Sequence, residues 1–304
     1  MSDFLPRPVS RPLGQTGLEV SPLAWGMWRL VDVGLDADAT ARLAHAALDS
    51  GITLFDTADI YGFDGKTGFG AAEVLLGEVL MREPGLRDRM VLATKGGIRP
   101  PLPYDQNPAY LAQAIDASLA RLKTDRIDLW QVHRPDLLAH PQEVARALDD
   151  AVAMGKVRAL GVSNFTTHQI AALQHFLGHK LVTTQPEISP LRLDCFANGE
   201  LDQAMTMGLV PLAWSPLAGG RIPAPGTPHE VEVAKALDVV ADAHRVPRSV
   251  ATFSWLMAHP AGIVPIVGSQ RALRIAEAAQ ALEVRWTRAQ WYAVYVAARG
   301  ERLP

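Results

Sequence analysis

The stretch that decides the fold is residues 127–162. It reads Ile127-Asp-Leu-Trp-Gln-Val132, then Pro141-Gln-Glu-Val-Ala-Arg-Ala-Leu-Asp-Asp-Ala-Val-Ala-Met154, then Gly155, and then Val157-Arg-Ala-Leu-Gly-Val162. The two outer runs are short and largely apolar, which is typical of parallel strands buried on both faces. The middle run starts with proline and is followed by glycine, the residues that favour the first turn and the end of a helix. The stretch therefore predicts a strand, a helix and a second strand.

The same order recurs along the chain. The other short apolar runs are Ser21–Trp25, Leu54–Phe55, Met90–Thr94, Leu181–Thr184, Leu209–Ala213 and Ile263–Val267. The other helical patterns are Ala39–Asp49, Pro108–Leu122, Thr167–Phe176, Asn198–Met207, Glu230–His244, Val250–Ala258 and Arg271–Ala281. Eight strands, each followed by helix, predict a closed (β/α)₈ barrel, an α/β fold that typically takes about 250 residues. The rest of the 304 residues leaves room for an N-terminal segment and a C-terminal helix near Thr287–Ala298.

An open, doubly wound sheet is the alternative fold. It usually carries a G-x-G-x-x-G turn after an early strand, and none of the expected strands here is followed by one. The composition does not change abruptly along the chain, so we expect a single domain over residues 1–304.

Composition excludes several classes of function. With 29 Lys and Arg against 32 Asp and Glu, the net charge is −3, so there is no basic excess for broad nucleic-acid or membrane-surface binding. No apolar run approaches the roughly 18 residues of a membrane span, and the N-terminus lacks a signal-peptide core. The only cysteine, Cys195, cannot form an internal disulfide, and we expect a cytoplasmic protein.

Polar residues gather where the expected strands end. In a barrel, the active site lies at the carboxyl ends of the strands, so these residues should meet although they are distant in sequence. They are Gly26, Trp28, Asp56, Tyr61, Lys95, His133, Ser163, Asn164, Gln185, Trp214, Ser215, Gly268 and Ser269.

Four of these residues form a plausible acid–base unit. A tyrosine with a pKa near ~10 is a poor proton donor or acceptor at neutral pH, but a nearby Lys⁺ lowers that pKa. Lys95 could act in this way on Tyr61, and Asp56 could neutralise the buried ammonium. His133 could hydrogen-bond the phenol or a substrate oxygen. Such a set suits interconversion of a carbonyl and an alcohol, which also needs a hydride carrier.

The sequence resembles the aldo-keto reductases over nearly its full length. The matching pieces, in family order, are Leu13–Ser21, Asp56–Gly62, Glu73–Gly77, Thr94-Lys95, Asp128–His133, Gly161–Phe165, Gln185, Trp214–Leu217 and Pro265–Ser269. The first piece looks like the family's opening β-hairpin. His133–Asp136 and Ala213–Arg221 look closest to a bacterial oxidoreductase branch.

The resemblance implies NADPH-dependent reduction of aldehydes or ketones. Tyr61 would donate the proton, Lys95 paired with Asp56 would lower the Tyr61 pKa, and His133 would orient the carbonyl. Trp28, the loops 62–70 and 99–107 and the C-terminal tail would line the pocket of a small carbonyl substrate.

The resemblance also assigns cofactor contacts along the strand ends. Ser163, Asn164 and Gln185 would hold the nicotinamide, and Trp214 would stack on its ring. The pyrophosphate would lie along Ser215, Leu217 and Gly219. The 2′-phosphate would contact Ser269, Arg271 and Arg274. Two departures weaken the preference for NADPH over NADH. Gly268 stands where NADPH-specific members often have Lys, and Glu277-Ala278 replaces Glu-Asn.

Two other functions remain open from the residues. One is a barrel that binds the nucleotide and reports it to a partner with little turnover. The other, weaker one is a lyase or isomerase that uses Lys95 as a Schiff base. We expect no metal site, because the remaining histidines lack ligand spacing such as H-E-x-x-H. A monomer is the common state in the family.

Overall fold

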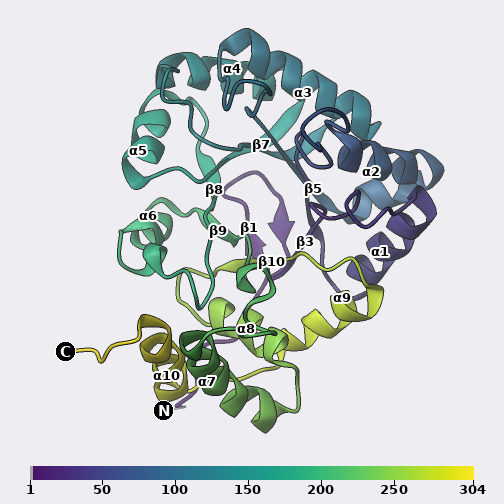
Figure 1. The fold of residues 1–304 in the computed structure, drawn as a ribbon. Coiled ribbons are helices and arrows are strands. Elements are labelled where there is room, and N and C mark those ends of the chain that lie inside the picture. Colours follow the sequence, from purple (N-terminus) through teal and green to yellow (C-terminus); the bar gives the residue numbers. More distant parts are fainter. Residues whose placement is uncertain (1–2) are drawn as a thin grey trace.

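The computed structural model describes residues 3–304 and contains the expected barrel (Figure 1). Eight parallel strands close on themselves, since the last strand pairs with the first through Ile266 and Ala24. The barrel strands are β3 (Ala24–Gly26), β4 (Leu54–Asp56), β5 (Val91–Gly96), β6 (Ile127–Val132), β7 (Val157–Ser163), β8 (Leu181–Gln185), β9 (Val210–Ala213) and β10 (Val264–Val267). The predicted (β/α)₈ architecture is confirmed.

Helices surround the barrel. The ring consists of α1 (Ala37–Asp49), α2 (Ala71–Arg82), α3 (Pro108–Leu122), α4 (Pro141–Ala153), α5 (Thr167–Phe176), α6 (Glu200–Met207), α8 (Arg248–Met257) and α9 (Ala272–Ala278). Two further helices, α7 (Pro228–His244) and the C-terminal α10 (Arg288–Arg299), pack against each other at one side of the barrel (Figure 1). Short 3₁₀ segments are η1 (Pro84–Arg89), η2 (Asp194–Phe196), η3 (Ala218–Gly220) and η4 (Ala279–Leu282). Within residues 3–304, no helix has the length and hydropathy needed to cross a bilayer.

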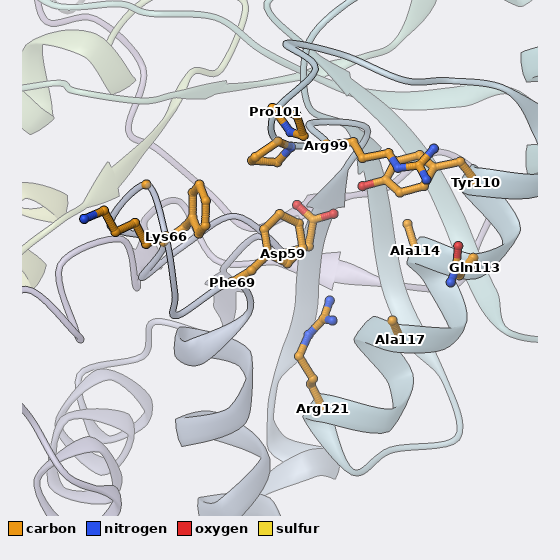
Figure 2. A pocket seen from close by; sticks show the side chains of 13 residues that line it. Asp59, Lys66, Phe69, Arg99, Pro101, Tyr110, Gln113, Ala114, Ala117 and Arg121 are labelled. Atoms are coloured by element: carbon orange, nitrogen blue, oxygen red, sulfur yellow. The ribbon is translucent and has the colours of Figure 1, made fainter.

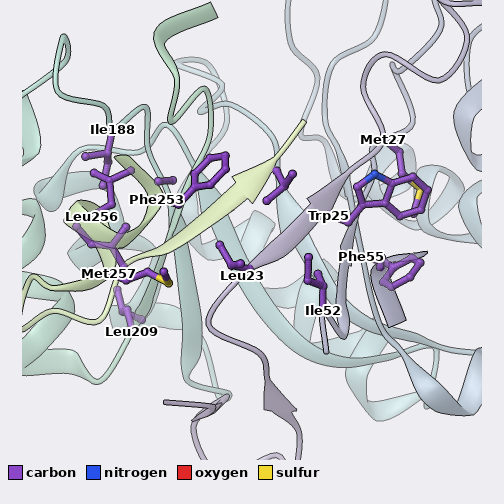
Figure 3. Close-up of a cluster of buried hydrophobic side chains, with 14 of the residues drawn as sticks. Leu23, Trp25, Met27, Ile52, Phe55, Ile188, Leu209, Phe253, Leu256 and Met257 are labelled. Carbon is purple, nitrogen blue, oxygen red and sulfur yellow. The ribbon is translucent and has the colours of Figure 1, made fainter. Parts of the chain in front are cut away.

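The apolar core has two layers. The larger layer lies between the strands and the helices, and Figure 3 shows part of it, where Trp25 and Phe55 meet edge to face at 5.2 Å. The second layer fills the barrel itself with side chains such as Leu54, Leu129 and Leu212. Both sides of each strand are therefore buried, which explains the short, continuous apolar runs in the sequence.

An antiparallel hairpin of β1 (Arg11–Pro12) and β2 (Glu19–Val20) precedes the barrel, as the resemblance implies. Leu13, Leu18 and Val20 from this hairpin join the inner core layer. The hairpin therefore closes the end of the barrel at which the strands begin, and it leaves the opposite end open.

Helix α2 is the one ring helix that the periodicity does not predict. Its sequence is apolar on most sides and is interrupted by Gly77, and its N-terminus at Gly70 has no side-chain cap. The structure shows why glycine is needed, since a Cβ at residue 77 would lie 2.0 Å from the carbonyl oxygen of Arg121. Because α2 packs closely against α3 and is apolar on most sides, it lacks a single amphipathic stripe. Its hydrophobic periodicity therefore does not predict a helix.

Candidate active site

A buried ion pair lies at the open end of the barrel. Asp56 is the last residue of β4, and the Lys95 Nζ on β5 donates to its Oδ2 at 2.7 Å and to the Thr57 carbonyl at 2.8 Å. The two side chains are only 3% and 1% exposed, respectively. Burial acts to lower the pKa of Lys95, but attraction to Asp56 and Tyr61 outweighs burial and raises it above its usual range. Lys95 is therefore a charged ammonium at neutral pH.

Tyr61 lies beside this pair. The Lys95 Nζ is 5.0 Å from the centre of the Tyr61 ring. Burial raises the pKa of Tyr61, and the Lys95 ammonium acts in the opposite direction without cancelling the rise. The sequence shows the nearby charge of Lys95 but not the depth of burial, so the predicted decrease in the Tyr61 pKa is wrong. The phenol is protonated at neutral pH.

His133 completes the group from the end of β6. Its ring meets the Tyr61 ring edge-on at 5.9 Å. Its Nδ1 is buried and has no hydrogen-bond partner in the described part of the chain. Burial, together with the positive charges of Lys95 and Arg134, holds the pKa of His133 well below its usual value. The imidazole is therefore neutral, with one nitrogen ready for a hydrogen bond.

Trp28 lies at the rim of this group. Its ring is stacked over Tyr61 at 6.4 Å and is 59% exposed. An exposed aromatic face above a buried polar group can shield a small molecule from water. Trp28 therefore lies beside Tyr61, and its role in a substrate pocket stays a prediction.

The next three strand ends are joined by side-chain hydrogen bonds. The Ser163 hydroxyl donates to the carbonyl of Gln185 at 2.9 Å, and the Asn164 amide donates to that hydroxyl at 2.9 Å. The Trp214 indole N–H in turn donates to the Asn164 side-chain oxygen at 3.0 Å. Asn164 has a left-handed backbone with φ of 59°, which turns its side chain toward its neighbours.

The remaining positions fit a dinucleotide along the open end. Ser215 and Gly219 have left-handed backbones, and the Gly219 N–H donates to the Ser215 hydroxyl at 3.1 Å. Gly268 is exposed, and a side chain there would meet nothing within 4 Å. Arg271 and Arg274 are exposed just beyond β10, and neither contacts a carboxylate among residues 3–304. Two exposed guanidinium groups without a carboxylate partner in the described part of the chain can bind a phosphate.

The sequence pattern does not indicate two features of this region. The Gln185 Nε2 donates to the Asp56 Oδ1 at 2.9 Å, so both carboxylate oxygens of Asp56 are occupied. Asp59, three residues later, belongs to the same motif and yet contacts a different cavity, outside the strands. Asp59 lies in the loop after β4, where strand alternation no longer applies, so the sequence pattern does not predict its placement.

Comparisons with known proteins agree with the barrel fold. A model of the Aldo/keto reductase family matches residues 22–296. A 6-dehydroglucose reductase from Novosphingobium aromaticivorans is 70% identical over 304 residues, which is all of both chains. Another 6-dehydroglucose reductase, from Agrobacterium fabrum, is 38% identical over 94% of this chain and 97% of that protein.

A solved structure shares the fold. The thermostable aldo-keto reductase Tm1743, in complex with the inhibitor epalrestat, superposes with a TM-score of 0.82 over 95% of this chain and 99% of that one, at 23% identity. The family match spans nearly every strand and helix described above. The chain belongs to the aldo/keto reductase family and is an oxidoreductase of the type that uses a nicotinamide cofactor.

Proposed function

We propose that the protein catalyses NADPH-dependent reduction of the C6 aldehyde of a hexose, 6-dehydroglucose, to the primary alcohol. The observation that carries the chemistry is the protonated Tyr61 phenol beside the Lys95–Asp56 pair, with neutral His133 at its edge. The sugar is suggested by the 70% identical relative that bears this activity in its name.

Tyr61 donates its proton to the carbonyl oxygen as that oxygen gains negative charge. Lys95 stabilises the phenolate that remains, because its ammonium lies at the Tyr61 ring. Asp56 and the Thr57 carbonyl hold Lys95 in place. His133 donates a hydrogen bond from its neutral imidazole to the same carbonyl oxygen and fixes the direction of that oxygen. NADPH supplies the hydride when it is bound, and the aldehyde carbon receives it.

The cofactor contacts follow the order of the strand ends. Ser163, Asn164 and Gln185 would hold the nicotinamide amide group against Trp214. Ser215, Leu217 and Gly219 would line the pyrophosphate, and Gly268 would lie near the cofactor beside Ser269. Ser269, Arg271 and Arg274 receive the 2′-phosphate, and the two free guanidinium groups favour NADPH over NADH.

The same proposal includes the setting of the enzyme. We place it in the cytoplasm as a monomer of one domain, residues 1–304. Cys195 is the only cysteine and is buried, so the chain has no internal disulfide, which fits a reducing compartment.

The test is NADPH oxidation, followed by absorbance, with 6-dehydroglucose and with a simple aldehyde such as hexanal as the comparison. We expect faster turnover of the sugar aldehyde and loss of both activities in Tyr61→Phe. Tight NADPH binding without turnover of any aldehyde would support the nucleotide sensor instead. Conversion of the substrate that needs no NADPH, survives Tyr61→Phe and disappears after borohydride trapping would support the Schiff-base alternative.

A further inference from the structure

A side-chain hydrogen bond crosses the interior of the barrel at its open end. The Gln185 Nε2, at the end of β8, donates to the Asp56 Oδ1, at the end of β4, at 2.9 Å. In the closed ring of strands, β4 and β8 lie opposite each other, since three strands separate them in either direction. Both residues are buried. The bond therefore joins the half of the open end that carries Tyr61 to the half that is proposed to hold the nicotinamide.

The chemistry of the two groups fixes the orientation of the Gln185 amide. A carboxylate only accepts hydrogen bonds, so the NH₂ end of the amide must face Asp56. The carbonyl end, Oε1, accepts no hydrogen bond within residues 3–304. Gln185 can therefore hold Asp56 and still accept a hydrogen bond from a nicotinamide amide group. Because the two roles do not exclude each other, they need separate measurements.

The backbone of Gln185 is itself held in place. Its carbonyl accepts from the Ser163 hydroxyl at 2.9 Å and from the Asn164 N–H at 3.1 Å. Ser163 and Gln185 are also paired in the register of β7 and β8. Side chains on strands hold a site more precisely than side chains on loops. Gln185 is thus a fixed point from which the Asp56 carboxylate can be oriented.

The hydrogen bond divides the two oxygens of Asp56 between two donors. Lys95 Nζ donates to Oδ2, and Gln185 takes Oδ1. The torsion that turns an aspartate carboxylate is broad, so a carboxylate held on one side only can rotate. With Oδ1 bound, Asp56 presents Oδ2 to Lys95 in one orientation. The ammonium is then kept at its position 5.0 Å from the centre of the Tyr61 ring.

The other carboxylate of this loop does not replace Asp56. Asp59 lies on the helix side of β5, where Figure 2 shows it between the Arg99–Pro101 segment and α3. A Cβ at Gly96, the residue after Lys95, would lie 3.0 Å from the Asp59 Oδ2. Within residues 3–304, the ion-pair partner of Lys95 is Asp56 alone. An orientation that is lost at Asp56 is therefore not restored by Asp59.

We propose that Gln185 is a positioning residue for the reaction, which holds the Lys95 ammonium beside Tyr61 through its hydrogen bond to Asp56. The inference rests on the proposed role of Tyr61 as proton donor. It gives β8 a part in proton transfer that is independent of any contact between Gln185 and the cofactor. The arrangement of Lys95 should therefore change in a variant that lacks the amide donor, even before a cofactor is added.

The ammonium protons of Lys95 provide a local measurement in the full-length protein without cofactor. Among the lysines of residues 3–304, Lys95 alone is buried, and its Nζ donates to two oxygens. Its protons should therefore exchange slowly with water and give a separate NMR signal when lysine is isotope-labelled. Gln185→Met keeps the length of the side chain and removes the donor, and we expect it to make this exchange about tenfold faster or more.

Two further variants separate this effect from a general loosening of the barrel. Gln131→Met is the same change at another buried amide of the barrel interior, one that bonds Thr183 and not the ion pair. It should leave the Lys95 exchange rate within about twofold of the wild type. Gln185→Asn keeps an amide but withdraws it by one methylene group, and it should accelerate the exchange as Gln185→Met does. It also replaces Gln185→Met if that variant does not fold.

Turnover separates positioning from cofactor binding. At saturating NADPH, Gln185→Met should lower kcat about tenfold, while KM for the aldehyde changes by less than about twofold. The Kd for NADPH, measured separately by fluorescence quenching, reports any contact of Gln185 with the nicotinamide.

The proposal would be overturned if the ammonium protons of Lys95 exchanged as slowly in the Gln185 variants as in the wild type. A weaker Kd for NADPH with unchanged exchange would assign Gln185 to the cofactor alone. Equal acceleration in Gln131→Met would also overturn it. Failure of the proposed reaction is recognised differently, because a wild-type protein that reduces no aldehyde would remove the reductase whatever the exchange rate of Lys95.

Discussion

Two buried ion pairs stand at opposite ends of the same barrel and differ in what surrounds them. At the closed end, Asp128 near the start of β6 accepts from Arg87 at 2.7 Å, from Arg158 at 3.2 Å and from the Leu92 N–H at 2.9 Å. At the open end, the Lys95–Asp56 pair is also buried and has the same 2.7 Å separation. Its neighbours include polar atoms without partners in the described structure, namely His133 Nδ1 and Thr57 Oγ1.

The surroundings of the two pairs show how a charge pair that only stabilises the fold can be distinguished from one that serves catalysis. Burial and short distances are the same in both pairs, so neither property separates them. What separates them is the presence of unsatisfied groups next to the pair at the open end, where a ligand can satisfy them. The comparison makes different predictions for substitutions at the two ends.

The largest expected effect is on catalysis at the open end. Tyr61→Phe removes the proton donor and should lower kcat by about 10²–10⁴-fold, while NADPH affinity, measured by fluorescence quenching, stays within about twofold. Tyr292→Phe, on exposed α10, serves as the control and should keep full activity. Near-normal turnover in Tyr61→Phe would show that unsatisfied polar groups beside a buried charge pair do not mark the catalytic end of the barrel.

The next largest effect is on stability at the closed end. Arg87→Met removes the closest charged partner of the buried Asp128 carboxylate and should lower the free energy of unfolding by about 3–5 kcal/mol, measured by urea denaturation. The exposed pair of Arg126 and Asp88 offers a control, because Arg126→Gln should cost less than about 1 kcal/mol. At a temperature where Arg87→Met is folded, its kcat should match that of the wild type; a selective loss of kcat would show that the closed end also serves the chemistry.

A smaller effect concerns the cofactor. Arg274→Ala removes a charge-assisted contact and should raise the Kd for NADPH about tenfold to a hundredfold while the Kd for NADH changes little. Arg146→Ala on α4 should change neither Kd. Equal weakening of both cofactors would show that Arg274 does not contact the 2′-phosphate.

The smallest expected effect is a pH dependence that arises from His133. Its pKa is lowered in the folded protein, so below about pH 6.5 the unfolded chain binds a proton at His133 that the folded chain does not. The free energy of unfolding should therefore fall as the pH falls below this value, by up to about 1.4 kcal/mol per pH unit from this residue. His133→Gln should remove that part of the slope in urea titrations, and His168→Gln on the surface should retain it.

The sequence predicts the strands well because each is a short apolar run bounded by polar or glycine residues. Ile127–Val132 is found at the predicted bounds, as are the helices Pro108–Leu122 and Thr167–Phe176. The grouping of Asp56, Tyr61, Lys95 and His133 follows from the barrel rule, since strand ends converge whatever their separation in sequence.

Other features depend on contacts that a sequence pattern does not contain. Helix α2 is fixed by the close approach of Gly77 to the Arg121 backbone. The net direction of the Tyr61 pKa shift depends on how deeply the phenol is buried. The different surroundings of Asp56 and Asp59 depend on which side of β5 each carboxylate lies.

The hairpin at residues 11–20 has a consequence for assembly of the chain. Leu13 and Val20 belong to one buried cluster with side chains of the strands from β3 to β10, so the complete surface that they cover exists only when the last strand has joined the first. We therefore expect this short segment to dock fully only after the barrel has closed. The time at which this segment becomes resistant to protease during refolding would report when the final step of folding occurs.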